Sequence, residues 1–205
     1  HRDLHSFPTR RSSDLNWPRK LFRDSFRQVS FYQVVDYRRR ERDLASNLQL
    51  MDQEGYLGFA DTDGSLLEQY RAIASLERDL LSGAADRSLL PDYRAARESF
   101  FADIGAFLLP PGDPALGGRV AVEERIRGEY TRLLESGKFS VEQVATIREL
   151  LDYATTLFDA TRSVHAALVR QRASLTESLK DRFVIIGYTG TSTTDIGVKI
   201  GRAHV

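Results

Sequence analysis

The chain has 205 residues, of which 29 are basic and 29 acidic, so its formal net charge at pH 7 is zero. It contains no cysteine, which excludes disulfides, zinc sites built on thiolates and thiol catalysis. No apolar run approaches the ~20 residues that a bilayer-spanning helix needs, and the length suits one ordinary core or a small domain with a second one inserted.

Both ends of the chain resemble translated sequencing adapters. The last residues, "IGRAHV", are what the codons ATC GGA AGA GCA CAC GTC encode, and they match the start of a common short-read adapter. Near the other end, "HSFPTRRSSDL" matches the translation of the opposite adapter. We therefore expect residues 1–15 and 200–205 to be read-through artefact and leave the origin of Lys199 open. The alternative is that the first residues form a basic arm that binds nucleic acid.

Removing these ends changes the chemistry that the sequence offers. Basic side chains fall from 29 to 25 and acidic ones from 29 to 27, which leaves a net charge of −2. His165 becomes the single histidine. Since no basic excess remains, we expect no nucleic-acid partner.

Two helices are predicted in the first half of the chain. The first begins at Ser30, where Gln33 three residues later completes a capping box, and apolar positions at helical spacing follow. A loop rich in glycine, aspartate and threonine separates it from the second helix. That helix begins at Ser65, with Glu68 in the capping-box position, and ends at Gly83.

Three further helices follow. One begins near Pro91 and stops at "PPGDPALGG", whose prolines and glycines cannot continue a helix. The next runs from about Arg119 to Ser136. The last begins at a third capping box, Ser140 with Gln143, and no glycine or proline interrupts it before "RFVIIG". Its ~40 residues would span ~60 Å, which is typical of a stalk or of one long member of a bundle.

The sequence "RFVIIG" predicts a strand. Residues 183–187 are apolar up to the closing glycine, so we expect a strand buried on both faces, as in a parallel sheet covered by helices. Such a strand needs partner strands, which we expect upstream of residue 16 or downstream of residue 198.

A loop rich in glycine, threonine and serine follows this strand, in the place where open α/β sheets bind ligands. It lacks the Gly-Lys-Ser/Thr ending of a P-loop, and its glycines do not fit G-x-G-x-x-G, so we expect no nucleotide site. Two interpretations stay open: a tight turn capped by its own hydroxyls, or a polar ligand pocket. The pocket would be lined by Thr189, Thr191, Ser192, Thr193, Thr194 and Asp195.

Three other features carry weaker signals. His165 lies on the apolar face of the long helix without a second histidine, which favours helix packing over catalysis or metal binding. The mixed charge run from Asp36 to Asp43 is typical of a solvated helix face with i to i+4 ion pairs. The sequence "DTDG", Asp61 to Gly64, is too short for a calcium loop and has no glutamate at the twelfth position. We therefore predict no catalytic residue, no metal and no cofactor in this chain.

Two segments resemble consecutive blocks in the second half of the CHASE type 2 domain, the cyclase/histidine-kinase-associated sensory extracellular domain. The first is "LNWPRKLFRDSFRQVSFYQVV", with Asn16 and Trp17 at the end of a strand and the helix start at Ser30. The second is "LKDRFVIIGYTGTSTTDIGV", in which the strand at 183–187 is followed by threonines and Asp195. The two blocks lie close together in that family, whereas here a long helical segment separates them.

This resemblance divides the chain into five segments: the adapter-like ends 1–15 and 200–205, the sensory-domain segments 16–38 and 179–199, and a helical insertion at 39–178. The expected fold class is therefore mostly α in this fragment. We expect it to be the remnant of an α/β sensory domain, with one buried strand at 183–187 and an inserted helical subdomain.

The resemblance also implies a function. The chain would be an extracytoplasmic, periplasmic fragment of a receptor in the cell membrane, with membrane-spanning segments on both sides that are absent from this sequence. The cytoplasmic output would be an adenylate or guanylate cyclase, or a kinase, and the fragment itself would not be an enzyme. Its partners would be an unknown small-molecule or protein signal and, through the long amphipathic helix, a second copy of the chain.

Two other hypotheses stay open. The first is a stand-alone helical interaction or scaffold domain, which a genomic reading frame without membrane segments would favour. The second is a small soluble α/β enzyme, which upstream sequence with a complete catalytic constellation would favour.

Overall fold

The computed structural model describes residues 29–60, 65–180, 183–186 and 199–202, and most of these residues are helical. The helices are α2 (Phe31–Gln53), α3 (Leu66–Ser82), α4 (Leu90–Phe107), α5 (Val122–Glu135) and α6 (Val141–Leu179). Three short 3₁₀ turns connect them: η2 (Tyr56–Phe59), η3 (Arg87–Leu89) and η4 (Pro114–Leu116). The strands are β1 (Phe183–Ile186) and β2 (Lys199–Arg202).

The helices begin and end close to where the sequence places them. Gly83 ends α3 in the left-handed conformation, with φ 78°, which a residue with a side chain rarely adopts. The long helix α6 is confirmed as a continuous element of 39 residues; at 1.5 Å per residue it is about 58 Å long. Helix α5 begins later than expected, at Val122, because Arg119 still belongs to a turn in which its amide donates to the Leu116 carbonyl at 3.0 Å.

Only one of the three predicted capping boxes forms. At α6 the Ser140 hydroxyl accepts the Gln143 amide at 3.3 Å, and the Gln143 side chain accepts the Ser140 amide at 2.9 Å. At α2 the Ser30 hydroxyl accepts the amide of Tyr32 instead, and Ser65 makes no cap bond through its side chain. The other two capping-box predictions are therefore wrong, although both helices begin where expected.

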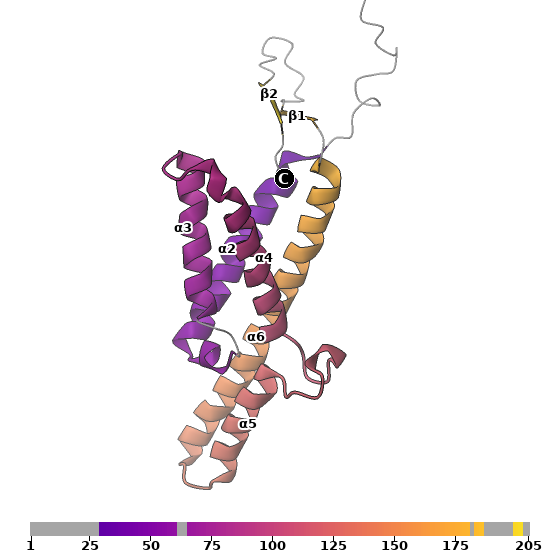
Figure 1. Cartoon of the computed structure of the whole chain (residues 1–205). Helices are drawn as coiled ribbons and strands as arrows, with labels where there is room; N and C mark the ends of the chain where they lie inside the picture. The colour runs from indigo at the N-terminus through magenta and orange to yellow at the C-terminus, as the bar shows by residue number, and fades with distance from the viewer. Residues whose placement is uncertain (1–28, 61–64, 181–182, 187–198, 203–205) are drawn as a thin grey trace, which may run out of the picture.

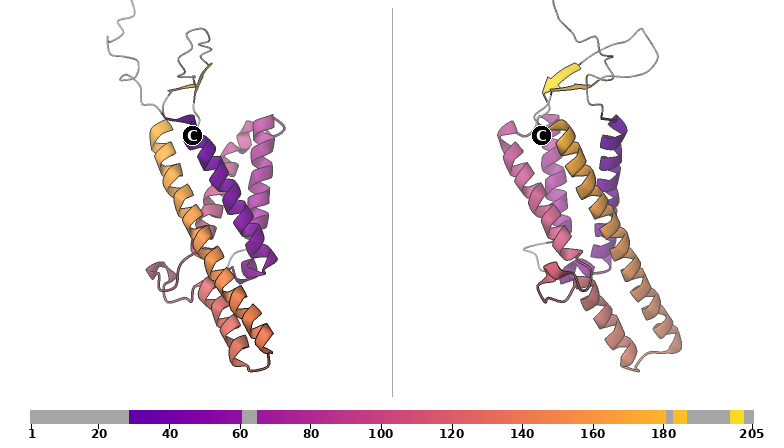
Figure 2. Two further views of the ribbon diagram at one scale, coloured as in Figure 1. Left: turned by 180° about the vertical axis from the view of Figure 1, so that it is seen from behind. Right: turned by 90° about the vertical axis from the view of Figure 1, so that its right-hand side faces the viewer.

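Helix α6 runs along the whole molecule. Its C-terminal part lies beside α2, whereas its N-terminal part forms an antiparallel hairpin with α5 that extends beyond the other helices (Figures 1 and 2). Helix α3 packs against α2 and α4. The described helices thus form a bundle of α2, α3, α4 and the C-terminal part of α6, from which the α5–α6 hairpin projects.

The hydrophobic core lies where α2, α4 and α6 meet. Leu48 and Ile104 are fully buried there, as is the ring of Phe158. The Phe158 ring lies 5.5 Å from that of Phe107 and 6.3 Å from that of Tyr56, measured between centroids, in tilted arrangements that favour aromatic pairs. This aromatic contact joins α6 to α4 and to the turn η2.

The fold class expected from the sequence is wrong. The described residues form a helical bundle, and in them β1 pairs only with β2, antiparallel, with Phe183 opposite Arg202 and Ile186 opposite Lys199. We therefore find neither the parallel sheet nor the doubly buried strand expected at 183–187. A short apolar run indicates extended backbone but fixes neither the number nor the direction of its partner strands. Strand β2 itself consists of Lys199 and the first residues of the adapter-like end.

The helical unit begins and ends at the same end of the molecule. The start of α2 and the end of α6 lie side by side in every view (Figures 1 and 2). The side-chain amide of Gln171 on α6 donates to the Gln33 carbonyl on α2 at 2.7 Å, and it lies 3.4 Å from the Asp36 carboxylate. The two helices are therefore tied together in the first turn of α2 and about two turns before the end of α6.

Candidate functional site

The candidate ligand residues of the sequence lie outside the described part of the chain. This holds for the whole loop after β1: Thr189, Thr191, Ser192, Thr193, Thr194 and Asp195. It holds also for the segment Asp61 to Gly64. The polar-pocket hypothesis for this loop therefore stays a prediction.

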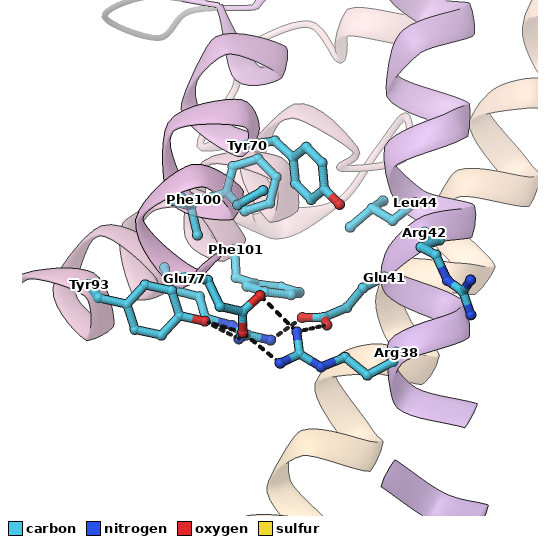
Figure 3. Close-up of a pocket in the computed structure, with 12 residues that line it drawn as sticks. Arg38, Glu41, Arg42, Leu44, Tyr70, Glu77, Tyr93, Phe100 and Phe101 are labelled. Atoms are coloured by element: carbon cyan, nitrogen blue, oxygen red, sulfur yellow. Dashed lines mark hydrogen bonds and ion pairs between the residues drawn. The ribbon is translucent and has the colours of Figure 1, made fainter. Parts of the chain in front are cut away.

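A pocket of about 340 Å³ opens instead between α2, α3 and α4 (Figure 3). This volume lies at the lower end of the range for small-molecule sites. The lining residues recur at intervals of three and four, which places them on one face of each helix: Arg38, Glu41, Arg42 and Leu44 on α2, Tyr70, Ile73, Ala74 and Glu77 on α3, and Tyr93, Arg97, Phe100 and Phe101 on α4.

One side of the pocket is apolar and the other is charged. On the apolar side the rings of Tyr70 and Phe100 lie 5.8 Å apart between centroids. On the charged side Arg38 faces Glu77 across the pocket (Figure 3). Its guanidinium makes two hydrogen bonds to the Glu77 carboxylate, at 2.6 and 2.9 Å, and a third to Glu41 at 2.9 Å. This forked arrangement is the geometry that arginine and carboxylate groups prefer.

Arg97 on α4 connects the charged side to the aromatic side. Its side chain is only 16% exposed, and it donates to the Glu41 carboxylate and, at 2.7 Å each, to the hydroxyls of Tyr37 and Tyr93. The guanidinium carbon also lies 5.6 Å from the centroid of the Tyr37 ring and 5.8 Å from that of Phe101, within cation–π range. With the Glu77 carboxylate on α3 at 3.8 Å, groups from α2, α3 and α4 converge on a single guanidinium.

The charges of the pocket are fixed near neutral pH. Burial acts to raise the pKa of Glu77, but hydrogen bonds from Arg38 and Tyr93 outweigh it and hold that pKa below its usual range. Burial raises the pKa of the Tyr37 and Tyr93 hydroxyls, so both stay neutral. The ionisable groups here are therefore suited to holding a ligand by charge rather than to exchanging protons with it.

Sequence reasoning missed this pocket because it treated the charge run from Asp36 to Asp43 as solvent-facing. The expected i to i+4 pair does form, between Asp36 and Arg40 at 2.8 Å. Arg38 and Glu41, however, turn toward α3 and α4. The signal that could have found them is their spacing to Leu44, which repeats the three-residue interval of a buried face.

His165 on α6 packs against α4. Its Nε2 lies 3.2 Å from the Phe101 carbonyl, and its ring stacks on the Phe101 ring with centroids 6.0 Å apart. Gly105 lies beside the imidazole, and a Cβ at that position would lie 3.4 Å from it, at van der Waals contact. Burial lowers the pKa of His165, and the hydrogen bond to the Phe101 carbonyl only partly opposes that shift. These contacts are those of a residue that packs two helices together.

A buried ion pair joins α5 to α6. Glu123 in the first turn of α5 is only 4% exposed, and it accepts a hydrogen bond from Arg162. The Arg162 guanidinium also donates to the Leu108 carbonyl at the end of α4, at 2.8 Å. These contacts orient the projecting hairpin relative to the bundle.

Comparison with protein-family models, curated proteins and solved structures gave no match for this chain. Within the described residues, no group of three or more histidines and acids is placed to hold a metal ion. Among the described helices, none combines the length and the apolar character that crossing a membrane requires. The resemblance to the CHASE type 2 domain accordingly stays a prediction.

Proposed function

We propose that the chain is part of an extracytoplasmic sensory domain of a membrane-bound signalling receptor whose output is an adenylate or guanylate cyclase. The helical unit is an insertion into that domain on the periplasmic side. This proposal rests on the two sequence blocks that resemble the CHASE type 2 domain, and the observation that carries it furthest is the position of the two ends of the helical unit.

An inserted unit leaves and rejoins its host at nearly the same place. The hydrogen bond between Gln171 and the Gln33 carbonyl brings the first and last helices together at one end, as an insertion requires. A stand-alone bundle has no such requirement. The adjacency of α2 and α6 therefore supports the insertion hypothesis.

Apolar side chains gather at this end. Phe31 and Tyr32, in the first turn of α2, are 71% and 69% exposed, and Val35 one turn later is 44% exposed. Large apolar groups that lie together on a surface favour burial against another structure. All three belong to the sensory-domain segment 16–38, and in our proposal they pack against the rest of the sensory domain.

The proposed signal passes along α2. Arg38, Glu41 and Leu44 line the pocket, and Gln33 at the start of the same helix is bonded to α6. A ligand that binds one arrangement of α2, α3 and α4 more tightly than another shifts the population toward it. Through α2 that shift reaches the attached end.

A second copy of the chain is a further proposed partner. The apolar face of α6 that suggested dimerisation packs inside the molecule, with Ala154, Phe158 and Leu168 buried. A dimer contact would therefore use other residues. Val141 and Leu133 are exposed on the projecting hairpin and are available for it.

The genomic reading frame around residues 16–198 tests the proposal. We expect codons for membrane-spanning segments on both sides and for a cyclase domain downstream; a kinase domain in its place would keep the receptor and change the output. A stop codon soon after Val198 would contradict the receptor hypothesis. The stand-alone helical interaction domain would then be the better account, because the projecting α5–α6 hairpin offers exposed apolar side chains to a partner.

A further inference from the structure

A second cavity lies beside the pocket, between α2 and α3. This α2–α3 groove, also about 340 Å³, is lined by residues from Arg42 to Gln49 on α2 and from Leu67 to Arg71 on α3. Arg42 and Tyr70 line both the pocket and the groove. A single extended molecule in contact with Tyr70 can therefore occupy parts of both.

The combined cavity carries an excess of positive charge. Four arginines line it, against the two glutamates Glu41 and Glu77, so its net charge is +2. The chain as a whole is neutral. A concave surface of one sign concentrates ions of the opposite sign, so the cavity favours an anion.

The arginines are not equally available to such an anion. Arg38 and Arg97 are held by Glu41, Glu77 and two tyrosine hydroxyls. Arg42 and Arg71 have no hydrogen-bond or ion-pair partner among the residues that the structure describes. Figure 3 shows Arg42 pointing away from the ion-pair network. A guanidinium matches the two oxygens of a carboxylate, so these two exposed arginines can accept one without breaking an existing pair.

The remaining wall favours an apolar body on the same molecule. Tyr70, which lines both the groove and the pocket, is half-buried, and its ring lies beside that of Phe100. Leu44 and Ile73 extend this apolar wall. Flat rings stack on such aromatic walls with centroid separations of 4.5–7 Å.

We propose that the pocket and the α2–α3 groove bind a small organic carboxylate with an aromatic body. Arg42 and Arg71 hold the carboxylate, and the body lies on Tyr70 and extends into the pocket. The role of this ligand as the signal of a receptor rests on the proposed function. The binding of the ligand is independent of the proposed function, because the residues involved all belong to the described helical unit.

Phenylacetate titrated into the full chain, with binding followed by calorimetry or by ligand-observed NMR, tests this site. We expect a dissociation constant on the order of 1 mM, which suits so small a ligand. Phenylacetamide, which has the same shape without the charge, should bind at least about tenfold more weakly, because a charge-assisted hydrogen bond is lost. Absence of phenylacetate binding at about 20 mM, or equal binding of the amide, would overturn the proposal.

Single variants locate the site. Arg42→Gln and Arg71→Gln should each weaken phenylacetate binding by about tenfold. The matched control is Arg78→Gln, an exposed arginine on α3 outside both cavities, which should keep the original affinity. Unchanged circular dichroism would show that all three variants fold. Equal affinity in all three would place the binding elsewhere and overturn the assignment, whatever the genomic reading frame shows.

Discussion

Arg97 joins α4 to α2 through hydrogen bonds and an ion pair. Its partners come from three helices: Glu41 and Tyr37 on α2, Glu77 on α3 and Tyr93 on its own helix α4. Its side chain is largely withdrawn from water. Its loss would leave Glu41 with Arg38 as its one remaining cationic partner among the described residues and would remove the hydrogen bonds to the buried Tyr37 and Tyr93 hydroxyls.

We therefore predict that Arg97→Ala lowers the free energy of unfolding by about 3 kcal/mol, measured by urea denaturation. Arg94→Ala, an exposed arginine on the same helix, is the control and should change it by less than about 0.5 kcal/mol. Equal small effects of both substitutions would show that Arg97 does not hold the helices together.

His165 gives the protein a predicted dependence on pH. Burial places the pKa of the folded imidazole below the unfolded value of ~6.5. Just below pH 6.5 the unfolded chain then binds more protons than the folded one. Stability contributed by neutral His165 is complete above that pH, falls as the pH drops toward the folded pKa, and levels off below it.

The test compares wild type with His165→Gln, which can still donate to the Phe101 carbonyl. Between pH 7.5 and 5.5 the free energy of unfolding should fall more for wild type than for the variant. Once the pH is below the folded pKa, the difference should reach ~1.4 kcal/mol for each unit by which folding lowers the pKa of His165. An equal loss of unfolding free energy in the two proteins would mean that the folded structure does not disfavour the protonated imidazole.

The charged side of the pocket shows what sequence reasoning can and cannot find at the scale of single residues. The pair Asp36–Arg40 follows from positions on one helix, and the sequence predicts it. The pairs of Arg38 with Glu77 and of Arg97 with Glu41 join separate helices. They depend on how the helices are arranged in space, which no local pattern contains.

At the scale of elements, local sequence signals were sufficient to predict where the helices lie along the chain. Glycine and proline end a helix through their own backbone restrictions, and α6 begins at Ser140 because its capping box is complete. The sequence predicted extended backbone at 183–186, but the parallel sheet expected around it was wrong. Which strand pairs with it depends on residues distant in the sequence, and a local apolar run does not specify them.

The capping results give a direct comparison between two serines. Ser140→Ala should lower the free energy of unfolding by about 1 kcal/mol, because two reciprocal hydrogen bonds are lost. Ser65→Ala should cost less than about 0.5 kcal/mol, since its hydroxyl makes no cap bond. Thermal or urea unfolding measures both, and a larger loss at Ser65 would mean that its predicted capping box does form.

For the whole molecule, the claim on which the proposed function depends is that α2 begins where α6 ends. The helix boundaries are compatible with several arrangements of the helices in space. What selects this one is the cluster of buried side chains shared by α2, α4 and α6, together with the contact between Gln171 and α2. Neither follows from the order of the helices along the chain.

Pulsed electron–electron spin resonance measures this claim directly, and the chain is suited to it because it contains no cysteine. Labels at Tyr32→Cys and Ser174→Cys, both exposed positions, should lie roughly 15–25 Å apart, since packed helices lie ~10 Å apart and the labels add to that. Labels at Tyr32→Cys and Val141→Cys should lie about 50 Å apart, because most of α6 separates them. Distances of similar length for the two pairs, or a first pair beyond about 40 Å, would contradict the shared end of α2 and α6 and with it the proposed insertion.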